Sequence, residues 1–494
     1  MNLRPTSLYM RSQSASSFVF DVPTGHSEQA LLAPPHTRVQ TPSIGSDAIP
    51  EPETSGPASY IVISGGTGCN TICSAFGQDV CYVLPVSDNG GSSSEIIRVL
   101  GGPSIGDIRS RLIRLIPSAP PMSPSERIKH LLSFRFATEA SEREARDLWR
   151  DIVEGRSDLW SGIPADRKET IRGFLVYFDG EVLKRANKSF SFRNASIGNF
   201  FLTAMHLFFR SVPSAIFLFS SITGSAANIL PVLVTNHTVT IAAELKDWKI
   251  LVGQCEISHP SRSSGPTIVM SRAHEDRAHQ WDDSAPTDAM HHEEATIQDN
   301  VAYTKQDDDD YDPLGSPINR VFYINQYGQE IYPTPNPLFL KNLGLKTFLV
   351  YSCGSLYTSI IPCLALRGVA SSIARSKSLK AKVLLLNGKN DRETHDYTAS
   401  DYIWAIANTL NRYNIAGPPT AHGNTSLRRD SDDVFPISAF ITHLVYLKAT
   451  TIHVDVEEIT KLGVACIEAE STTDSLLFDS RAVENAMDRV LSSV

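Results

Sequence analysis

Residues 60–109 read YIVISGGTGCNTICSAFGQDVCYVLPVSDNGGSSSEIIRVLGGPSIGDIR. The stretch holds three glycine-bearing turns, and two of them come directly after apolar, β-rich runs, YIVI and CYVLPV. A strand that ends in glycines and leads into a helix directs bare backbone N–H groups and the positive end of a helix dipole at one place. The stretch therefore predicts strand–turn–helix units that bind a phosphorylated or nucleotide-like ligand.

Strand-like and helix-like segments continue beyond this stretch. Helices are expected at 93–100, 106–116, 124–134, 139–154, 165–187, 197–210, 398–410 and 481–492, with one beginning at 355. Strands are expected at 60–64, 81–86, 229–234, 238–245, 249–257, 320–324, 345–352, 381–387, 440–448 and 464–469. The alternation predicts an α/β fold with a mostly parallel sheet and helices on both faces. Ligands of such sheets bind at the carboxyl ends of the strands, where the glycine turns fall.

Three polar segments divide the chain. Residues 1–58 contain many prolines and serines and are expected to be a disordered tail, and 259–317 is expected to be a disordered acidic insertion that includes four consecutive aspartates. Residues 417–433 are expected to be a flexible loop. The α/β domain then consists of a first part at 59–258 and a second part at 318–494.

The composition limits the classes of partner and compartment. A formal net charge of -9 argues against a nucleic-acid binder, and no run of 18 apolar residues is present to span a membrane. The seven cysteines are scattered, several in apolar runs, which indicates reduced thiols in a cytoplasmic protein. Arg4 and Arg11, among serines and before any acid, weakly resemble a transit peptide.

The first turn, Gly65-Gly66-Thr67-Gly68, predicts a phosphate-binding loop. It lacks the spacing of a dinucleotide fingerprint and the lysine of a P-loop, so neither a standard NAD site nor a standard ATP site is indicated. The alternative is a tight strand-to-helix turn that needs glycine only for its geometry.

The second turn carries the candidate catalytic residue. Asp88, at a strand end, is the residue type that ligates Mg²⁺ or accepts a hydroxyl proton, and it is the candidate metal ligand as well. The candidate ligand-binding residues that follow it are Asn89, Gly90, Gly91, Ser92 and Ser93. An Asx turn with helix caps is the alternative.

Further candidates for binding the ligand come from four other turns. Asp107 and Arg109 lie in the first turn of a predicted helix, where an arginine can bind a phosphate through two hydrogen bonds. A capped helix with a local salt bridge explains them equally well. The other candidates are Gly198, Asn199, Gly354, Ser355, Thr358, Ser359 and Asn387.

The motifs GGTG, SDNGGSS, GDIR, NASIGN and GSLYTSIIP, followed by LLLNGKNDRETHDYTASDY, resemble in content and order the family of 2-phospho-L-lactate transferase (CofD) and the gluconeogenesis factor YvcK. The resemblance implies a Rossmann-like core. It also implies an enzyme that binds a nucleotide diphosphate ester and, with Mg²⁺, transfers a phosphoryl-bearing group to a hydroxyl.

The same resemblance leaves a rival function open. The family usually has a second acid where this chain has Asn89, and the DNGGSS form is closer to the YvcK branch, which is similar to a non-catalytic regulator that binds nucleotide sugars. A dehydrogenase is disfavoured by the missing fingerprint. The expected partner is a nucleotide or nucleotide-diphosphate ligand, and the sequence also allows a homodimer.

Overall fold

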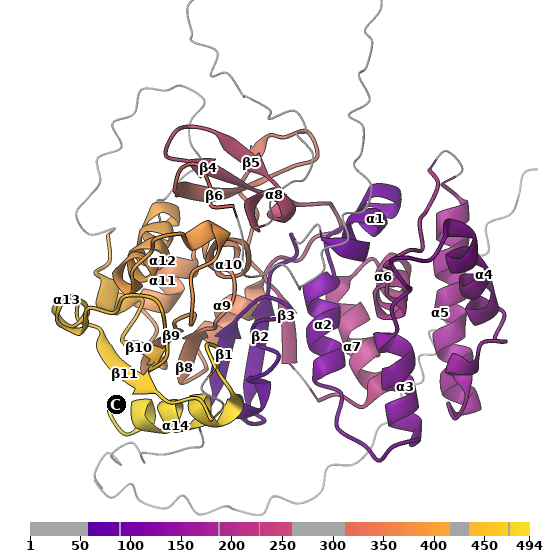
Figure 1. Ribbon diagram of the computed structural model, residues 1–494, viewed down its shortest axis with the longest axis horizontal. Helices are drawn as coiled ribbons and strands as arrows, with labels where there is room; N and C mark the ends of the chain where they lie inside the picture. The colour runs from indigo at the N-terminus through magenta and orange to yellow at the C-terminus, as the bar shows by residue number, and fades with distance from the viewer. Residues whose placement is uncertain are drawn as a thin grey trace, which may run out of the picture. The chain divides into compact units, whose positions relative to one another are not determined.

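Seven strands form one parallel sheet at the centre of the computed structural model, which describes residues 58–87, 90–185, 188–226, 228–258, 312–414, 434–472 and 475–494. Within these ranges the strand order is β11-β10-β9-β8-β1-β2-β3, which Figure 1 shows running from left to right. The strands are β1 (Tyr60–Ile63), β2 (Val80–Leu84), β3 (Asn228–Pro231), β8 (Phe348–Tyr351), β9 (Ala381–Leu385), β10 (His443–Leu447) and β11 (Ala465–Ala469).

Burial of the central strands explains why the sheet is parallel. Every residue of β1, β2, β8 and β9 is buried, so both faces of the sheet are covered. Strands with this pattern read as continuous apolar runs and occur in doubly covered parallel sheets. The predicted Rossmann-like α/β fold is confirmed.

The topological switch point lies at β1. Its two neighbours, β2 and β8, come from distant parts of the chain, and Ile63 is in register with both Val83 and Tyr351. The turn after β1 is therefore beside the turn after β8, because parallel strands end at the same edge. Open α/β sheets bind ligands at such a point.

A second sheet corrects the prediction for the middle of the chain. The strands β4 (Thr240–Leu245), β5 (Ile250–Val252), β6 (Ile318–Ile324) and β7 (Glu330–Ile331) pair antiparallel in the order β5-β4-β6-β7. The strand predicted at 249–257 is wrong beyond Val252, because Gly253 has a positive φ of 88° and the helix α8 (Gln254–Ser258) follows. The predicted strands 238–245 and 320–324 belong to this smaller sheet.

The helices of the first half of the domain follow β2 and precede β3. They are α1 (Gly91–Leu100), α2 (Gly106–Arg114), α3 (Pro124–Ser133), α4 (Glu142–Val153), α5 (Ala165–Leu183), α6 (Ile197–Phe209) and α7 (Val212–Thr223). The helix α7 was not predicted from the sequence. Arg210 ends α6 in the left-handed conformation, and the Ser211 side chain then caps α7.

The helices of the second half are mostly shorter. They are α9 (Pro337–Leu343), α10 (Ile361–Leu364), α11 (Val369–Ala374), α12 (Ala399–Tyr413), α13 (Val456–Lys461) and α14 (Ser480–Leu491). The helix expected to begin at 355 starts with a π-helical turn, η4 (Leu356–Ile360), before α10. The single-turn 3-10 helices η1 (Cys73–Phe76) and η5 (Arg392–Thr394) lie in connections near the candidate site.

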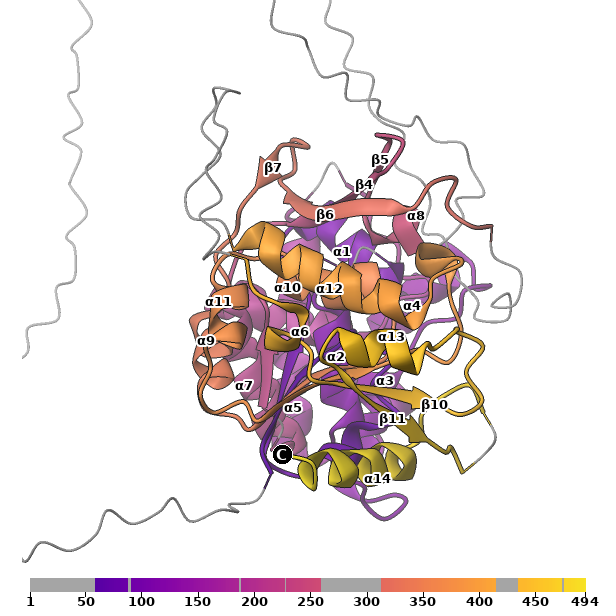
Figure 2. The same ribbon diagram turned by 90° about the vertical axis from the view of Figure 1, so that its left-hand side faces the viewer.

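Two tyrosines join the small sheet to the main domain. The Tyr323 hydroxyl of β6 donates to the Pro362 carbonyl of α10 at 2.8 Å, and the Tyr413 hydroxyl of α12 donates to the Val321 carbonyl of β6 at 2.9 Å. Figure 2 shows α10 and α12 beneath β6, on the side of the parallel sheet. The small sheet is therefore fixed above α10 and α12.

The predicted tail, insertion and loop lie outside the described residues, apart from residue 58 and residues 312–317. All seven cysteines are described, and none of them forms a disulfide. Within the described ranges, none of the helices is long and apolar enough to cross a membrane.

Candidate functional site

Three segments meet at the turn after β1. A Cβ atom added to Gly65 would overlap the Ser359 hydroxyl, and one added to Gly66 would overlap the Asp107 side chain. At Gly68 it would lie 2.7 Å from the Cys353 carbonyl oxygen and 3.0 Å from the Gly354 Cα. Only glycine permits this approach. The structure therefore brings six predicted residues together: Gly65, Gly66, Gly68, Asp107, Gly354 and Ser359.

The carbonyl groups of residues 65–67 accept hydrogen bonds from neighbouring protein groups. The Gly65 oxygen accepts from Arg111 Nη2 at 3.0 Å, and the Gly66 oxygen accepts from Asn70 Nδ2 at 2.6 Å and from Ser110 Oγ at 2.8 Å. The Thr67 oxygen accepts from the Asn70 backbone N–H at 2.9 Å. These donors, of which Arg111 is fully buried, thus fix which way the peptide planes face.

The backbone N–H groups of the same turn, unlike its carbonyl groups, lack hydrogen-bond partners among the described residues. Across the described part of the chain, the N–H groups of residues 65–68 have no hydrogen-bond acceptor. Thr67 and Gly68 are exposed to solvent. Successive backbone N–H groups left unpaired at a turn form an anion-binding concavity. The turn therefore presents hydrogen-bond donors of the kind that can bind an anion, and we call residues 65–68 the cradle.

Arg111 contacts the cradle from its buried side. It was not predicted as a site residue from the sequence. Its side chain is fully buried, donates to the Ser64 hydroxyl at 3.0 Å as well as to Gly65, and lies 4.8 Å from the centre of the Tyr82 ring. It also donates to the Cys73 sulfur. Its spacing from Ile108 and Leu112 on one helix did not distinguish it from a solvent-facing arginine.

The guanidinium of Arg111 changes the chemistry of a nearby thiol. Burial alone would raise the pKa of the Cys69 thiol, but a hydrogen bond from Cys73 and the positive charge of Arg111 outweigh burial and lower this pKa to about 6. A nearby positive charge favours the ionised form of an acid. The arginine that donates to the Gly65 carbonyl therefore also favours ionisation of the Cys69 thiol.

A chain of hydrogen bonds joins the first turns of three helices. Arg109 Nε of α2 donates to Asn199 Oδ1 of α6 at 2.9 Å, and Asn199 Nδ2 donates to Ser92 Oγ of α1 at 2.7 Å. Gly198 lies so close to Arg109 that an added Cβ would be 3.0 Å from the Arg109 Cδ atom. Four predicted residues therefore meet on the other side of α2 from Gly66.

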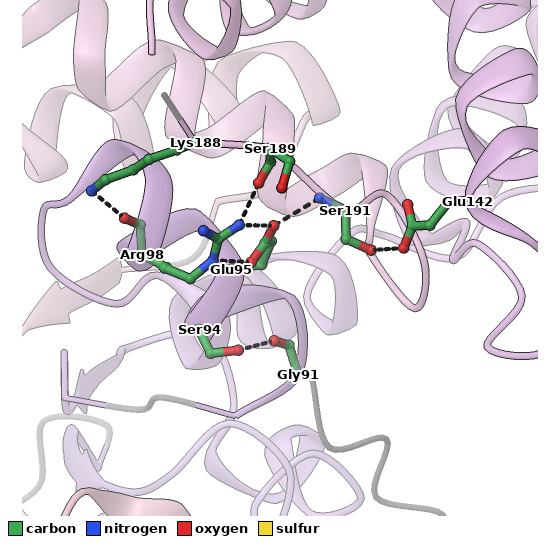
Figure 3. A network of polar contacts seen from close by, with 8 residues as sticks. All are labelled: Gly91, Ser94, Glu95, Arg98, Glu142, Lys188, Ser189 and Ser191. Carbon is green, nitrogen blue, oxygen red and sulfur yellow. Dashed lines mark hydrogen bonds and ion pairs between the residues drawn. The ribbon is translucent and has the colours of Figure 1, made fainter. Parts of the chain in front are cut away.

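Figure 3 shows how α1 is held in place. The Glu95 carboxylate accepts two hydrogen bonds from Arg98, each at 2.7 Å, and one from the Ser191 backbone N–H at 2.7 Å. Lys188 Nζ donates to the Arg98 carbonyl at 2.8 Å. Residues before α6 thus anchor α1, and the anchored helix presents Ser92 to Asn199.

The hydroxyl groups after β8 that were predicted to bind a ligand donate hydrogen bonds to a carboxylate of the protein. Glu393 is buried and accepts hydrogen bonds from Ser355 Oγ at 2.6 Å, Thr358 Oγ1 at 3.0 Å and the Tyr357 backbone N–H at 2.8 Å. It also accepts from the Ser258 hydroxyl of α8. Ligand binding by Ser355 and Thr358 stays a prediction, because both hydroxyls have a partner within the protein.

Asn387 likewise has a structural contact. Its Oδ1 accepts from the Gly354 N–H and its Nδ2 donates to the Gly354 carbonyl, both at 2.8 Å. The amide thereby fixes Gly354, whose φ of 135° suits glycine. Asn387 holds the neighbouring turn in place, and direct contact with a ligand stays a prediction.

Asp88 and Asn89 lie outside the described residues, and Ser93 and Gly90 flank the start of α1. Ser87, which precedes Asp88, has a buried hydroxyl with no partner among the described residues. In the same ranges, three or more His, Cys, Asp or Glu side chains do not gather as a metal site. The sequence-predicted metal ligand is thus left as a prediction.

Comparisons with known proteins agree with this architecture. The family model described as 2-phospho-L-lactate transferase CofD matches residues 60–472. The protein YNL011C of Saccharomyces cerevisiae, itself named as uncharacterised, is 34% identical over 457 residues, which cover 87% of this chain and 98% of the yeast protein. A protein of Clostridium acetobutylicum named as a gluconeogenesis factor is 21% identical over 349 residues, covering 70% of this chain and 52% of that protein.

A solved structure supports the fold alone. A member of the UPF0052 family from Bacillus halodurans superposes with a TM-score of 0.53 at 18% sequence identity. The match covers 87% of this chain and 100% of the bacterial chain. Because the family model spans both halves of the domain, the chain belongs to the CofD family.

Proposed function

We propose that this protein binds a nucleotide diphosphate ester at the Gly65–Gly68 cradle and transfers a phosphoryl-bearing group to a hydroxyl acceptor. One observation carries the proposal: the carbonyls of residues 65–67 accept hydrogen bonds from the protein, while the amide N–H groups of residues 65–68 have no acceptor within the described residues. A diphosphate provides the oxygens that such a group of donors binds.

Asp107 supports a role for Mg²⁺ in this binding. Its carboxylate lies against Gly66, and a carboxylate beside a diphosphate would repel it unless a cation lay between them. Mg²⁺ is typically held by one or two carboxylates together with substrate phosphates. Asp107 and the predicted Asp88 would hold the ion, which would neutralise charge developing on the phosphate oxygens.

The proposed reaction needs orientation rather than a covalent enzyme intermediate. The acceptor oxygen forms a bond to the distal phosphorus of the diphosphate, and the bond from that phosphorus to the bridging oxygen breaks. A nucleoside monophosphate leaves with the bridging oxygen, and the hydroxyl proton passes to Asp88. Holding both reactants in line provides most of the acceleration in transfers of this type.

A second candidate is a regulator that binds nucleotide sugars without a reaction. Asn89, in place of a second acid, favours it, and so does the similarity to a protein named as a gluconeogenesis factor. Both candidates use the same cradle, so they differ in turnover and in dependence on metal, not in the place of binding.

Substitution of Asp88 separates the two candidates. We expect Asp88→Ala to abolish release of nucleoside monophosphate while nucleotide affinity changes little, because the cradle's amides and Asp107, the other proposed metal ligand, remain. Asp247→Ala, in the exposed turn between β4 and β5, is the matched control and should keep full turnover. Unchanged turnover in Asp88→Ala would refute the assigned role of Asp88.

A further inference from the structure

Two thiols lie next to each other at the end of the cradle. Cys69 follows Gly68 directly, and Cys73 begins η1 one turn later. The Ile72 N–H donates to the Cys69 carbonyl at 3.2 Å, and the Cys73 thiol donates to the same carbonyl at 3.1 Å. A further hydrogen bond joins the two cysteine side chains. The turn therefore holds two buried sulfur atoms side by side.

A buried positive charge lies against this pair of thiols. Arg111 donates to the Cys73 sulfur, and the acidic groups whose charges act on it are Cys69, Cys73 and Tyr82. Among the described residues, no carboxylate forms an ion pair with Arg111, and its Nε atom has no hydrogen-bond partner. A cation beside a thiol favours the thiolate, which is the form that reacts with oxidants. The charge of Arg111 therefore makes this pair more reactive than an ordinary core cysteine.

The two thiols differ in how readily they ionise. The pKa of Cys69 falls to about 6, whereas the hydrogen bond with Cys69 and burial raise the pKa of Cys73. Formation of a disulfide needs one nucleophilic thiolate and a second thiol that attacks the oxidised first one. The half-buried Cys353 thiol also contacts the cradle, since it donates to the Gly68 carbonyl at 3.6 Å, but burial raises its pKa to about 12. Cys69 is therefore the nucleophile of the group, and Cys73 is its partner.

The position of Cys69 allows a small oxidant to approach. Its sulfur is buried, but Thr67 and Gly68, which precede it, are exposed to solvent. A surface turn opens locally at a lower free-energy cost than the core of a sheet. Cys81 in β2 and Cys363 in α10 are enclosed by the hydrophobic core, and burial raises the pKa of both. Oxidation should therefore begin at Cys69.

We propose that Cys69 and Cys73 form a reversible disulfide, and that this disulfide weakens phosphate binding at the cradle. The effect on binding rests on the proposed function, whereas the oxidation itself does not. The sulfur atoms of a disulfide lie about 2.05 Å apart, closer than those of two hydrogen-bonded thiols, and no S–H remains to donate to the Cys69 carbonyl. The turn at Cys69 must therefore shift when the bond forms.

A shift at Cys69 reaches the cradle through Asn70. The Asn70 N–H donates to the Thr67 carbonyl at 2.9 Å, and its side chain donates to the Gly66 carbonyl at 2.6 Å. Because C=O and N–H point in opposite directions across a trans peptide, these two bonds turn the N–H groups of Gly68 and Thr67 away from Asn70. Loss of this alignment should weaken anion binding about tenfold, the effect of one or two lost hydrogen bonds.

The oxidant is a peroxide, for which hydrogen peroxide is the simplest example. The Cys69 sulfur bonds to one peroxide oxygen, the O–O bond breaks, and the hydroxide that leaves takes up a proton to become water. The Cys73 sulfur then bonds to the Cys69 sulfur, the S–O bond breaks, and a second water leaves with the Cys73 proton. The two thiols together lose two electrons, and the peroxide is reduced to two waters. A dithiol reverses the change by thiol–disulfide exchange.

Peptide mapping of the full chain after treatment with hydrogen peroxide tests the disulfide. When the protein is then denatured and its free thiols are alkylated, Cys69 and Cys73 should be protected, while Cys81 and Cys363 should be alkylated. Cys73→Ser should stop the reaction at a sulfenic acid on Cys69, which dimedone labels. Cys81→Ser is the matched control and should form the disulfide like the wild type, because Cys81 is equally buried but lies in β2. Alkylation of both Cys69 and Cys73 in the treated wild type would overturn the inference.

Calorimetric titration with GDP and Mg²⁺ tests the effect on binding. The disulfide form should bind about tenfold more weakly than the reduced protein, and dithiothreitol should restore the affinity. Peroxide should not change the affinity of Cys69→Ser, which can form neither the sulfenic acid nor the disulfide. Equal affinities of the reduced and disulfide forms would show that the disulfide does not regulate the cradle. A disulfide that forms in a protein whose reduced state binds no nucleotide would instead contradict the proposed function and leave the oxidation site standing.

Discussion

The Asp107 carboxylate lies against the backbone of Gly66, so close that a side-chain carbon on residue 66 would be 2.7 Å from the Asp107 Cα. The contact ties the turn after β1 to the start of α2. It places an acid and a group of unpaired amides together at the switch point of the sheet. The proposed binding of a metal–diphosphate depends on this contact.

Gly66→Ala should destabilise the protein by about 1–3 kcal/mol, because the added carbon meets backbone that cannot move away. Urea unfolding measures the change. Gly173→Ala, in the middle of α5 with no atom near the added carbon, is the control and should stabilise by about 0.5–1 kcal/mol. A Gly66→Ala protein as stable as the wild type would show that the turn is loosely packed.

Asn199→Ala should break the link between Arg109 and Ser92. Asn199 is buried and makes one hydrogen bond as acceptor and one as donor, so its loss should cost about 1–3 kcal/mol of stability. Nucleotide affinity should fall as well, because three helix ends lose their alignment.

Asn411→Ala is the matched control for Asn199→Ala. Asn411 also donates once and accepts once, both with Phe435 at 2.9 Å, far along the sequence from the glycine turns. It should lower stability without changing nucleotide affinity. Equal losses of affinity in the two variants would mean that the effect of Asn199 is general destabilisation.

Asp391 should make stability depend on pH between about 4 and 7. Burial, together with the nearby charge of Glu393, raises the pKa of the Asp391 carboxyl from 3.8 to about 7. In this window the folded protein binds more protons than the unfolded chain, so stability is greatest at the acidic end and falls as pH rises through the folded pKa.

Asp391→Asn should remove this dependence. The amide oxygen can still accept from the Glu393 and Thr394 N–H groups, which the carboxylate accepts at 3.0 and 3.1 Å. The melting temperature of the variant should exceed that of the wild type at pH 8 and equal it at pH 4. Asp455→Asn, which alters an exposed cap of α13, should show no such convergence.

Much of the fold could be predicted because its signals are local. The buried strands β1, β2, β8 and β9 are short apolar runs followed by turn residues, and this pattern predicts buried β-strands. The antiparallel sheet could not be predicted, because a long insertion separates β4 from β6 and neither strand's sequence carries a local signal for the pairing. The missed helix α7 follows α6 after a two-residue break at Arg210 and Ser211, too short to signal a new element.

The candidate site shows the same division. The glycines at 65, 66 and 68 predicted that other groups come close to this backbone. The structure places Asp107, Gly354 and Ser359 against them. The hydroxyls of Ser355 and Thr358 suggested a phosphate pocket, but Glu393, more than thirty residues away, engages them. Arg111 was missed because an arginine's role depends on its tertiary neighbours.

The most direct measurement is a thermal-shift screen of the full chain with GDP, GTP, UDP-glucose, UDP-N-acetylglucosamine and NAD, each with and without Mg²⁺. A ligand that binds only the folded state stabilises it by about 2.7 kcal/mol at a hundred times its Kd. We expect a shift with the guanine nucleotides that requires Mg²⁺, because the resemblance to the transferases implies a guanosine diphosphate carrier. A metal-independent shift with the UDP-sugars alone would contradict the transferase and leave the regulator, and no shift with any nucleotide would contradict the cradle itself.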